Sequence, residues 1–328
     1  MSDLTASQSA GSDSRGRAFG RFLSRYGILI SFLILFVALS FAHPNFLSTG
    51  NLTNVLRQVS INGILAIGMT FVILTGGIDL SVGSILAVAG VVAGSLVTGG
   101  DPSHPMVAIL AAVAVGAAVG TINGTLVARF GVPAFVATLG MLSMARGATL
   151  LYSDGRPIPN LSPAFRWLGQ GFIAGVPVPV ILFLLVFVIA WIVLRFTVYG
   201  RWVYAVGGNV KSARTSGIPT RSVVFSVYLL MGALAGLAGA ILTARTTSAL
   251  PQAGLGYELD AIAAVVIGGT SLTGGIGSVV YTLIGALIIG VISNGLDLMG
   301  VSSYYQQIIK GAIIVVAVLV DRSRNSNP

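Results

Sequence analysis

The stretch Thr75–Ser84 reads T-G-G-I-D-L-S-V-G-S and places a single carboxylate, Asp79, between two long uncharged runs. These runs cover residues 58–78 and 80–100. Each is close to the ~20 residues that an α-helix needs to cross the hydrocarbon core of a bilayer. Because a glycine pair stands just before Asp79, the stretch predicts a break between two membrane helices.

The composition of the whole chain is that of a membrane protein. Of 328 residues, 55% are hydrophobic and 8% are charged, whereas about 25% of the residues of a soluble domain are charged. The continuous apolar runs predict an all-α integral membrane protein with about ten transmembrane helices, some of them short or broken. The predicted spans are 26–42, 57–75, 80–98, 106–128, 132–151, 177–195, 222–244, 259–273, 277–297 and 303–320.

Two predicted spans carry glycines at helical spacing. They are Gly116-x3-Gly120-x3-Gly124 and Gly232-x3-Gly236. Small residues on one face let two helices approach closely in lipid. The pattern predicts a tightly packed bundle and says nothing about cargo.

The distribution of basic residues predicts how the chain is oriented. With the N-terminus inside, the inner segments hold twelve lysines and arginines and the outer segments hold four, Arg57, Arg156, Arg166 and Arg245. Cytoplasmic loops carry such an excess. We therefore predict a cytoplasmic tail at 1–25, a transmembrane domain at 26–320 with a cytoplasmic loop at 196–221, and a cytoplasmic tail at 321–328. The net charge of +9 then indicates contact with anionic lipid rather than nucleic acid.

Several classes of site are missing from the sequence. There is no cysteine, and the two histidines fall in predicted loops, which excludes thiolate ligands and disfavours a histidine metal centre. The sequence contains no phosphate-binding loop and no catalytic constellation, so we predict neither an enzyme nor a bound cofactor. If ATP drives this protein, a partner must hydrolyse it.

The inner loop at 196–221 contains one short predicted helix. Asn209 is a good N-cap, and Gly217 stands where a glycine ends a helix, shortly before Pro219. In this prediction the helix lies outside the bilayer and carries small and basic side chains, those of Lys211, Ser212, Ala213 and Arg214. It is either an ordinary connector with topology charges or the contact site of a cytoplasmic partner.

Four segments occur in one order along residues 45–320. They are G-M-T-F-V-I-L-T-G-G-I-D-L-S-V-G-S (68–84), I-N-G-T-L-V (122–127), Y-A-V-G-G-N-V-K-S-A-R-T-S-G-I (204–218) and V-I-G-G-T-S-L-T-G-G-I-G-S (266–278). Together they resemble the ribose-type sugar permeases of the sugar and branched-chain amino-acid permease family. The third segment is also similar to the Glu-Ala-Ala-x-x-x-Gly loop of ABC importer permeases, with Lys211 in the place of the Glu.

The resemblance implies a bacterial inner-membrane permease that imports a monosaccharide, either a ribose-like pentose or a related sugar or polyol. In such importers two permease copies form the pathway, a cytoplasmic ATPase docks on the inner loops, and a periplasmic sugar-binding protein delivers the cargo. It therefore implies a homodimer. It also assigns the coupling contact with the ATPase to Asn209, Lys211, Ser212, Ala213, Arg214 and Gly217.

Polar side chains inside the predicted spans are the candidates for the transport pathway. They are Asn62, Asn123, Arg146 and Asn294. Such residues are costly in lipid and should face the interior of the bundle. Each asparagine either joins two helices by a hydrogen bond or lines the pathway. Arg146 needs a partner, which is either a set of helix-end carbonyls or Asp79.

A second stretch repeats the pattern of the first. Residues 76–83 and 268–275 share G-G-x-x-L-[S/T]-x-G, with Ser271 in the place of Asp79. We predict that the glycine pairs Gly76-Gly77 and Gly268-Gly269 each end or kink a helix. Asp79, Ser81 and Ser271 are then predicted to cap the helices that follow. Because serine cannot carry a proton in this way, the repeat favours a capping role for Asp79 over an ion-coupling role.

Two other functions remain open from the sequence. One is an ion-coupled secondary transporter, in which Asp79 or Asp260 would carry a proton or a sodium ion. The other is a branched-chain amino-acid permease of the same family. An intramembrane enzyme is disfavoured because no residue constellation supports one.

Overall fold

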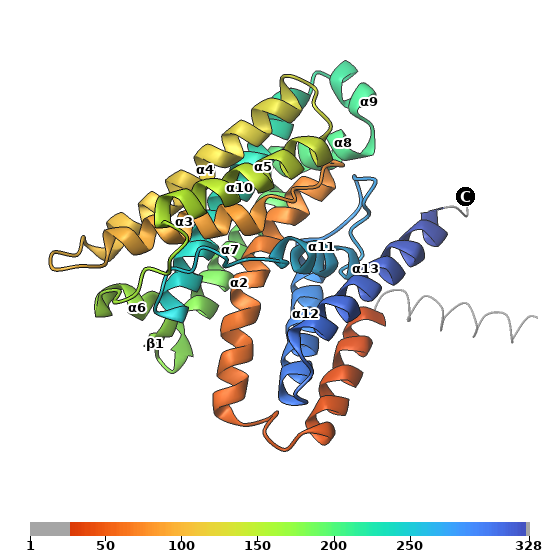
Figure 1. Cartoon of the computed structure of the whole chain (residues 1–328). Helices are drawn as coiled ribbons and strands as arrows, with labels where there is room; N and C mark the ends of the chain where they lie inside the picture. Colours follow the sequence, from red (N-terminus) through yellow and green to blue (C-terminus); the bar gives the residue numbers. More distant parts are fainter. Residues whose placement is uncertain (1–26, 326–328) are drawn as a thin grey trace, which may run out of the picture.

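The computed structural model describes residues 27–325 and is almost entirely helical (Figure 1). The predicted tail at 1–25 and the last three residues, 326–328, lie outside the described residues. The first described helix is Gly27–Ala42. It is followed by α2 (Thr49–Leu74), α3 (Val82–Leu96), α4 (Pro105–Ala128), α5 (Ala134–Ser153), α6 (Pro163–Gln170), β1 (Phe172–Ile173), β2 (Val176–Pro177), α7 (Val178–Phe196), α8 (Val198–Gly208), α9 (Val210–Thr215), α10 (Thr220–Thr246), α11 (Tyr257–Ile267), α12 (Val279–Leu298) and α13 (Ser303–Asn325).

Within residues 27–325, six helices are long and apolar enough to cross a membrane: α2, α4, α5, α7, α10 and α12. The helices Gly27–Ala42 and α3 are apolar but shorter. Every predicted span contains a helix, and the protein is a multi-pass membrane protein of the all-α class.

Three helix ends differ from the predicted boundaries by five residues or more. α2 begins at Thr49 and not at 57. α11 ends at Ile267 and not at 273. Its 11 residues rise about 16 Å, which is too short to cross ~30 Å of hydrocarbon. α13 continues to Asn325, five residues beyond the predicted end of its span at 320, so the described part of the predicted tail is helical. At α2 and α13 a charged residue stops the apolar run without stopping the helix. At α11 the glycine pair Gly268-Gly269 stops the helix within an uncharged run.

The centre of the bundle is α2, which is buried from Val59 to Leu74. α10 packs against α4, α3 and α2, and α12 packs against α2 and α11. The glycine pattern gives the α4–α10 contact its closeness, because a Cβ placed on Gly116 or Gly120 would overlap the backbone oxygen of Gly232 or Tyr228. The close packing predicted from these glycines is confirmed.

The long loop between α5 and α7 forms α6 and the short hairpin β1–β2, in which Phe172 pairs with Pro177. Arg57 fixes this segment to α2. Its guanidinium donates to the carbonyl of Gln170 and lies 4.9 Å from the ring centre of Phe172. This segment lies at one end of the bundle, and α8 and α9 lie at the other (Figure 1).

Candidate functional site

The two glycine-rich stretches of the repeat lie against each other. We call Thr75–Ser81 the first break loop and Gly268–Ser278 the second break loop. The amide of Gly275, in the second break loop, donates to the carbonyl of Leu74, the last residue of α2, at 2.9 Å. Two stretches that are distant in the sequence therefore form one junction inside the protein.

The glycine pairs stand at the ends of helices. α2 ends at Leu74 and is followed by Gly76, whose φ of 79° is left-handed. α11 ends at Ile267 with Gly268 as its C-cap, and Gly269 has a φ of 78°. Both pairs therefore follow the end of a helix, but the left-handed glycine is the first of the pair in one stretch and the second in the other.

Asp79 is fully buried, but it does not cap α3 as predicted. The N-cap residue of α3 is Ser81, and no side chain makes a capping hydrogen bond there. Oδ1 of Asp79 instead accepts from the amide of Ser81 at 2.9 Å and from its hydroxyl at 2.6 Å. The carboxylate lies two residues before the N-cap position, so it binds Ser81 within the first break loop and not the helix amides.

Ser271 does not cap a helix either. Its amide donates to the carbonyl of Ile276 at 2.9 Å, and its hydroxyl lies 3.0 Å from that of Thr273. The next helix, α12, begins only at Val279 and has Ser278 as its N-cap. The second break loop is therefore longer than the first, because it continues through further glycines before a helix can start.

The predicted cytoplasmic helix is α9. The side chain of Asn209 accepts from the amide of Ser212 at 2.9 Å, which makes Asn209 the N-cap. At the other end, Gly217 has a φ of 82°, its amide donates to Arg214, and the amide of Ile218 donates to Ala213. This pair of bonds is a Schellman motif, so Gly217 is the C′ glycine.

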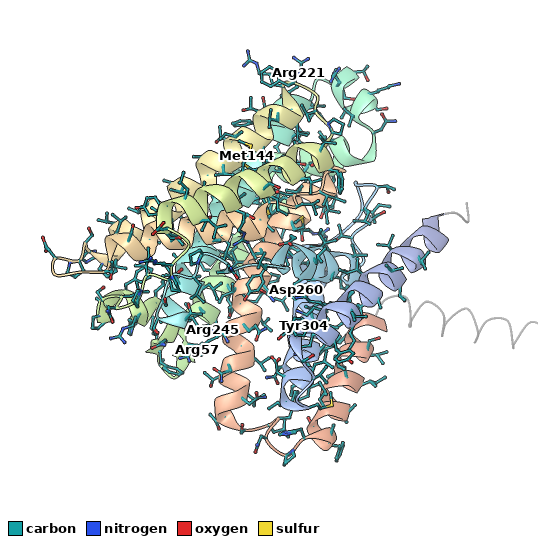
Figure 2. All side chains as sticks on the ribbon, in the orientation of Figure 1. Arg57, Met144, Arg221, Arg245, Asp260 and Tyr304 are labelled. Carbon is teal, nitrogen blue, oxygen red and sulfur yellow. The ribbon has the colours of Figure 1, made fainter. Side chains whose placement is uncertain are left out.

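The exposed face of α9 is basic and polar. Ala213 is buried, whereas Lys211, Ser212 and Arg214 are exposed. Arg221, at the start of α10, lies at the same end of the molecule as α9, and Arg57 and Arg245 lie near the opposite end (Figure 2). Both ends carry basic side chains, but those of α9 and Arg221 are exposed whereas Arg57 and Arg245 are half-buried.

α8 connects α9 to the second break loop. The hydroxyl of Tyr204 donates to the carbonyl of Gly277 at 3.0 Å. Burial raises the pKa of this tyrosine against the smaller opposite effect of Arg195, so the hydroxyl keeps its proton. On the same helix, the hydroxyl of Tyr199 lies 2.7 Å from that of Ser226 on α10.

The sequence offered two partners for Arg146, helix-end carbonyls or Asp79. In the structure, its partners are backbone carbonyls. Its Nη1 donates to Pro251 at 2.6 Å and to Ala253 at 3.0 Å, in the loop that precedes α11. Backbone carbonyls are among the partners that intramembrane charges use, although Nε of Arg146 has no hydrogen-bond partner among the described residues. Arg146 therefore joins α5 to the start of α11.

The three asparagines are all buried, at 3%, 0% and 9% exposure for Asn62, Asn123 and Asn294. Asn123 donates to the hydroxyl of Ser81 at 2.9 Å and so joins α4 to the first break loop. Asn294 exchanges two hydrogen bonds with Asn51, at 2.9 and 2.8 Å, and joins α12 to α2. The side-chain amide of Asn62 has no hydrogen-bond partner among the described residues.

Sequence reasoning missed two features of the site. One is the ion pair between Lys310 of α13 and Asp260 of α11, whose Nζ and Oδ2 lie 2.9 Å apart. The other is the contact of Gly207 with Leu74, at the end of α2, and with Gly275 of the second break loop. Neither has a local signal, because each depends on residues that the fold alone brings together. Within residues 27–325, no three His, Asp or Glu side chains gather into a metal site.

Comparison with known proteins extends this description. The model of the family "branched-chain amino acid transport system / permease component" matches residues 51–318. The ribose import permease protein of Escherichia coli K12 is 52% identical over 300 residues, which is 90% of this chain and 93% of that protein. That of Bacillus subtilis 168 is 50% identical over 311 residues, 94% of this chain and 96% of that protein.

A D-allose transport system permease protein of E. coli K12 is 40% identical over 324 residues, which is 98% of this chain and 99% of that protein. No solved structure matches the chain.

Proposed function

The chain belongs to the family of branched-chain amino acid transport system permease components, and we propose on this basis that it is the membrane permease of an ABC importer for ribose or a closely related monosaccharide. The observation that carries the proposal is the identity of 52% and 50% to ribose import permeases of two different bacteria, along nearly the whole length of each. The identity to the D-allose permease protein is lower, at 40%. The L-arabinose permeases are lower still, at 38% and 34%. This order favours ribose itself and does not separate pentoses from hexoses as classes.

The contacts of the buried acids argue against an ion-coupled transporter. Asp260 is paired with Lys310, and Oδ1 of Asp79 accepts from both polar groups of Ser81, while its Oδ2 is buried without a hydrogen-bond partner among the described residues. A coupling carboxylate has to exchange its ion with the pathway, whereas these two carboxylates hold the protein's own helices. The permease therefore needs its energy from a partner.

The family implies an ATPase and a substrate-binding protein as partners. We place the ATPase at α9, because this helix protrudes with the exposed residues Lys211, Ser212 and Arg214. Lys211 offers a cation where related loops have a Glu, so the surface that faces it should be acidic or neutral. The binding protein then docks at the opposite end, where Arg57 and Arg245 lie (Figure 2).

A second copy of the permease completes the pathway in this proposal. α5 buries only one stripe of side chains and exposes a broad apolar face that includes Phe135, Val136, Met144 and Leu151. Met144 is visible on this outer face in Figure 2. A face of this kind is covered by lipid or by a second permease, and we assign it to a homodimer in the bacterial inner membrane.

Uptake into proteoliposomes tests the proposal. The purified permease is reconstituted with the ATPase and the sugar-binding protein of the same bacterium, and labelled D-ribose is supplied on the side of the binding protein. We expect uptake that requires ATP and both partners, and that unlabelled ribose suppresses more strongly than D-allose or L-leucine. Uptake by the permease alone, driven by a proton or sodium gradient, would contradict it.

A further inference from the structure

We propose that Gly207 is the positioning residue through which α9 acts on both break loops at once, and that transport requires a residue without a side chain at this position. The inference rests on the proposed function, because it assumes that an ATPase moves α9. It goes further by naming one contact from which the movement of α9 is transmitted to two pairs of helices. These pairs are α2/α3, joined by the first break loop, and α11/α12, joined by the second.

Gly207 lies in backbone contact with the junction of the two loops. A Cβ added to it would overlap the carbonyl oxygen of Leu74 and the amide nitrogen of Gly275, the two groups that form the hydrogen bond between α2 and the second break loop. Every other residue type would have to displace backbone atoms here, which cannot swing away like the end of a side chain. The absence of a side chain at 207 is therefore a condition of this junction.

The first break loop is in contact with the same group of atoms. A Cβ on Gly274 would lie 2.9 Å from the amide nitrogen of Gly76 and 3.0 Å from the carbonyl oxygen of Gly207. The end of α8, the first break loop and the second break loop thus meet within one layer of backbone. A shift of any of the three is felt by the other two, because close-packed atoms transmit displacement.

α8 and α9 are held together firmly enough to move as one unit. Only Asn209 separates them, and it bonds to both helices. Its amide donates to Ala205 of α8 at 3.1 Å, while its carbonyl accepts from Ala213 of α9 at 2.9 Å. Its side chain caps Ser212 as well. If a partner displaces α9, α8 should move with it, and Gly207 near the end of α8 is displaced as well.

The break loops are suited to turn this displacement into helix movement. α3 begins directly after the first break loop, and α12 begins directly after the second. Neither loop is helical, so each can alter the angle between its flanking helices without breaking an intrahelical hydrogen bond. The hydroxyl of Tyr204 provides a second link, because it holds the carbonyl of Gly277 just before α12.

The neighbouring glycine offers a matched control. A Cβ on Gly208 would meet nothing within 4 Å. Gly207→Ala and Gly208→Ala therefore make the same chemical change at adjacent positions of one helix, and only the first acts on the junction. Both variants are compared with the natural chain, reconstituted with the ATPase and the sugar-binding protein.

Three quantities are measured on each: assembly with the ATPase, basal ATP hydrolysis, and sugar uptake. We expect Gly207→Ala to assemble and to hydrolyse ATP at its basal rate, while uptake falls about tenfold, within the range that coupling residues cause. Gly208→Ala should stay within about twofold of the natural chain for all three. Unchanged uptake by Gly207→Ala, or an equal loss in both variants, would overturn the inference.

A second pair of variants, with smaller structural changes, tests the inference if Gly207→Ala does not fold. Tyr204→Phe removes only the hydroxyl that holds Gly277, and Tyr199→Phe removes a hydroxyl of the same helix that contacts α10 instead. We expect uptake per ATP hydrolysed to fall about threefold in Tyr204→Phe, with little change in Tyr199→Phe. An unchanged ratio in Tyr204→Phe would then refute the inference. If the natural chain itself takes up no sugar with both partners, it is the proposed function that fails.

Discussion

The ammonium group of Lys310 lies 2.9 Å from Oδ2 of Asp260, and this pair joins the last helix, α13, to the short helix α11. The side chains are 20% and 5% exposed, so both charges are largely removed from solvent. Asp260 therefore has a structural role. The ion pair anchors α11, which is too short to span the membrane, to α13.

Removing the cation should therefore cost more than removing the pair. Lys310→Met leaves Asp260 buried and unpaired, which destabilises a protein by about 3–5 kcal/mol. The double variant Lys310→Met/Asp260→Asn leaves no buried charge and should regain most of the loss. Thermal unfolding of the purified permease in detergent measures both. Equal losses in the single and double variants would show that the unpaired carboxylate of Asp260 is not the cause of the loss.

Much of this fold could be predicted from local sequence signals. Asn209 and Gly217 bound α9 because the cap residues of a helix act within one turn of its ends. The glycines at 116 and 232 mark the α4–α10 contact for a similar reason, since their spacing follows the helix period. Signals of this kind need no knowledge of the rest of the chain.

The parts that could not be predicted depend on distant residues. Asp79 stands close enough to α3 to be mistaken for its cap, but the helix starts later and the carboxylate binds Ser81 instead. Gly207 looks like any helical glycine until Leu74 and Gly275 are placed beside it. In both cases the tertiary structure, and not the residue type, decides the role.

The role of Asp79 can be tested by two substitutions. Asp79→Asn keeps an oxygen that accepts from the amide and hydroxyl of Ser81, so we expect transport within about twofold of the natural chain. Asp79→Ala leaves these buried donors unpaired and should destabilise the protein by about 1–3 kcal/mol. Uptake and thermal unfolding are measured for both. Loss of uptake in a stably folded Asp79→Asn would mean that the charge itself is required.

The α4–α10 contact predicts different results for two glycines. Gly116→Ala would drive a methyl group into the backbone of Gly232, and we expect a loss of about 1–3 kcal/mol from overpacking. Gly147→Ala, on α5, meets nothing within 4 Å and should be neutral or slightly stabilising, because alanine favours a helix by up to about 1 kcal/mol. Thermal unfolding midpoints compare the two. A stable Gly116→Ala would mean that α4 and α10 can separate freely.

The last prediction concerns Gly217, which closes α9. Its φ of 82° is left-handed, and nothing lies within 4 Å of a Cβ built on it, so a substitution here meets strain but no clash. Valine in this conformation costs about 1–2 kcal/mol, whereas asparagine tolerates it and often ends helices. Gly217→Val should therefore fray α9, while Gly217→Asn should preserve it.

Because α9 lies at the end of the bundle, Gly217→Val should leave the membrane helices folded and weaken only the contact with the ATPase. We expect ATP hydrolysis stimulated by the sugar-loaded binding protein to fall, together with uptake, and both to be retained in Gly217→Asn. Both rates are measured in proteoliposomes, and thermal unfolding serves as the check on folding. If Gly217→Val transports normally, the end of α9 has no part in coupling and the ATPase must act on another surface.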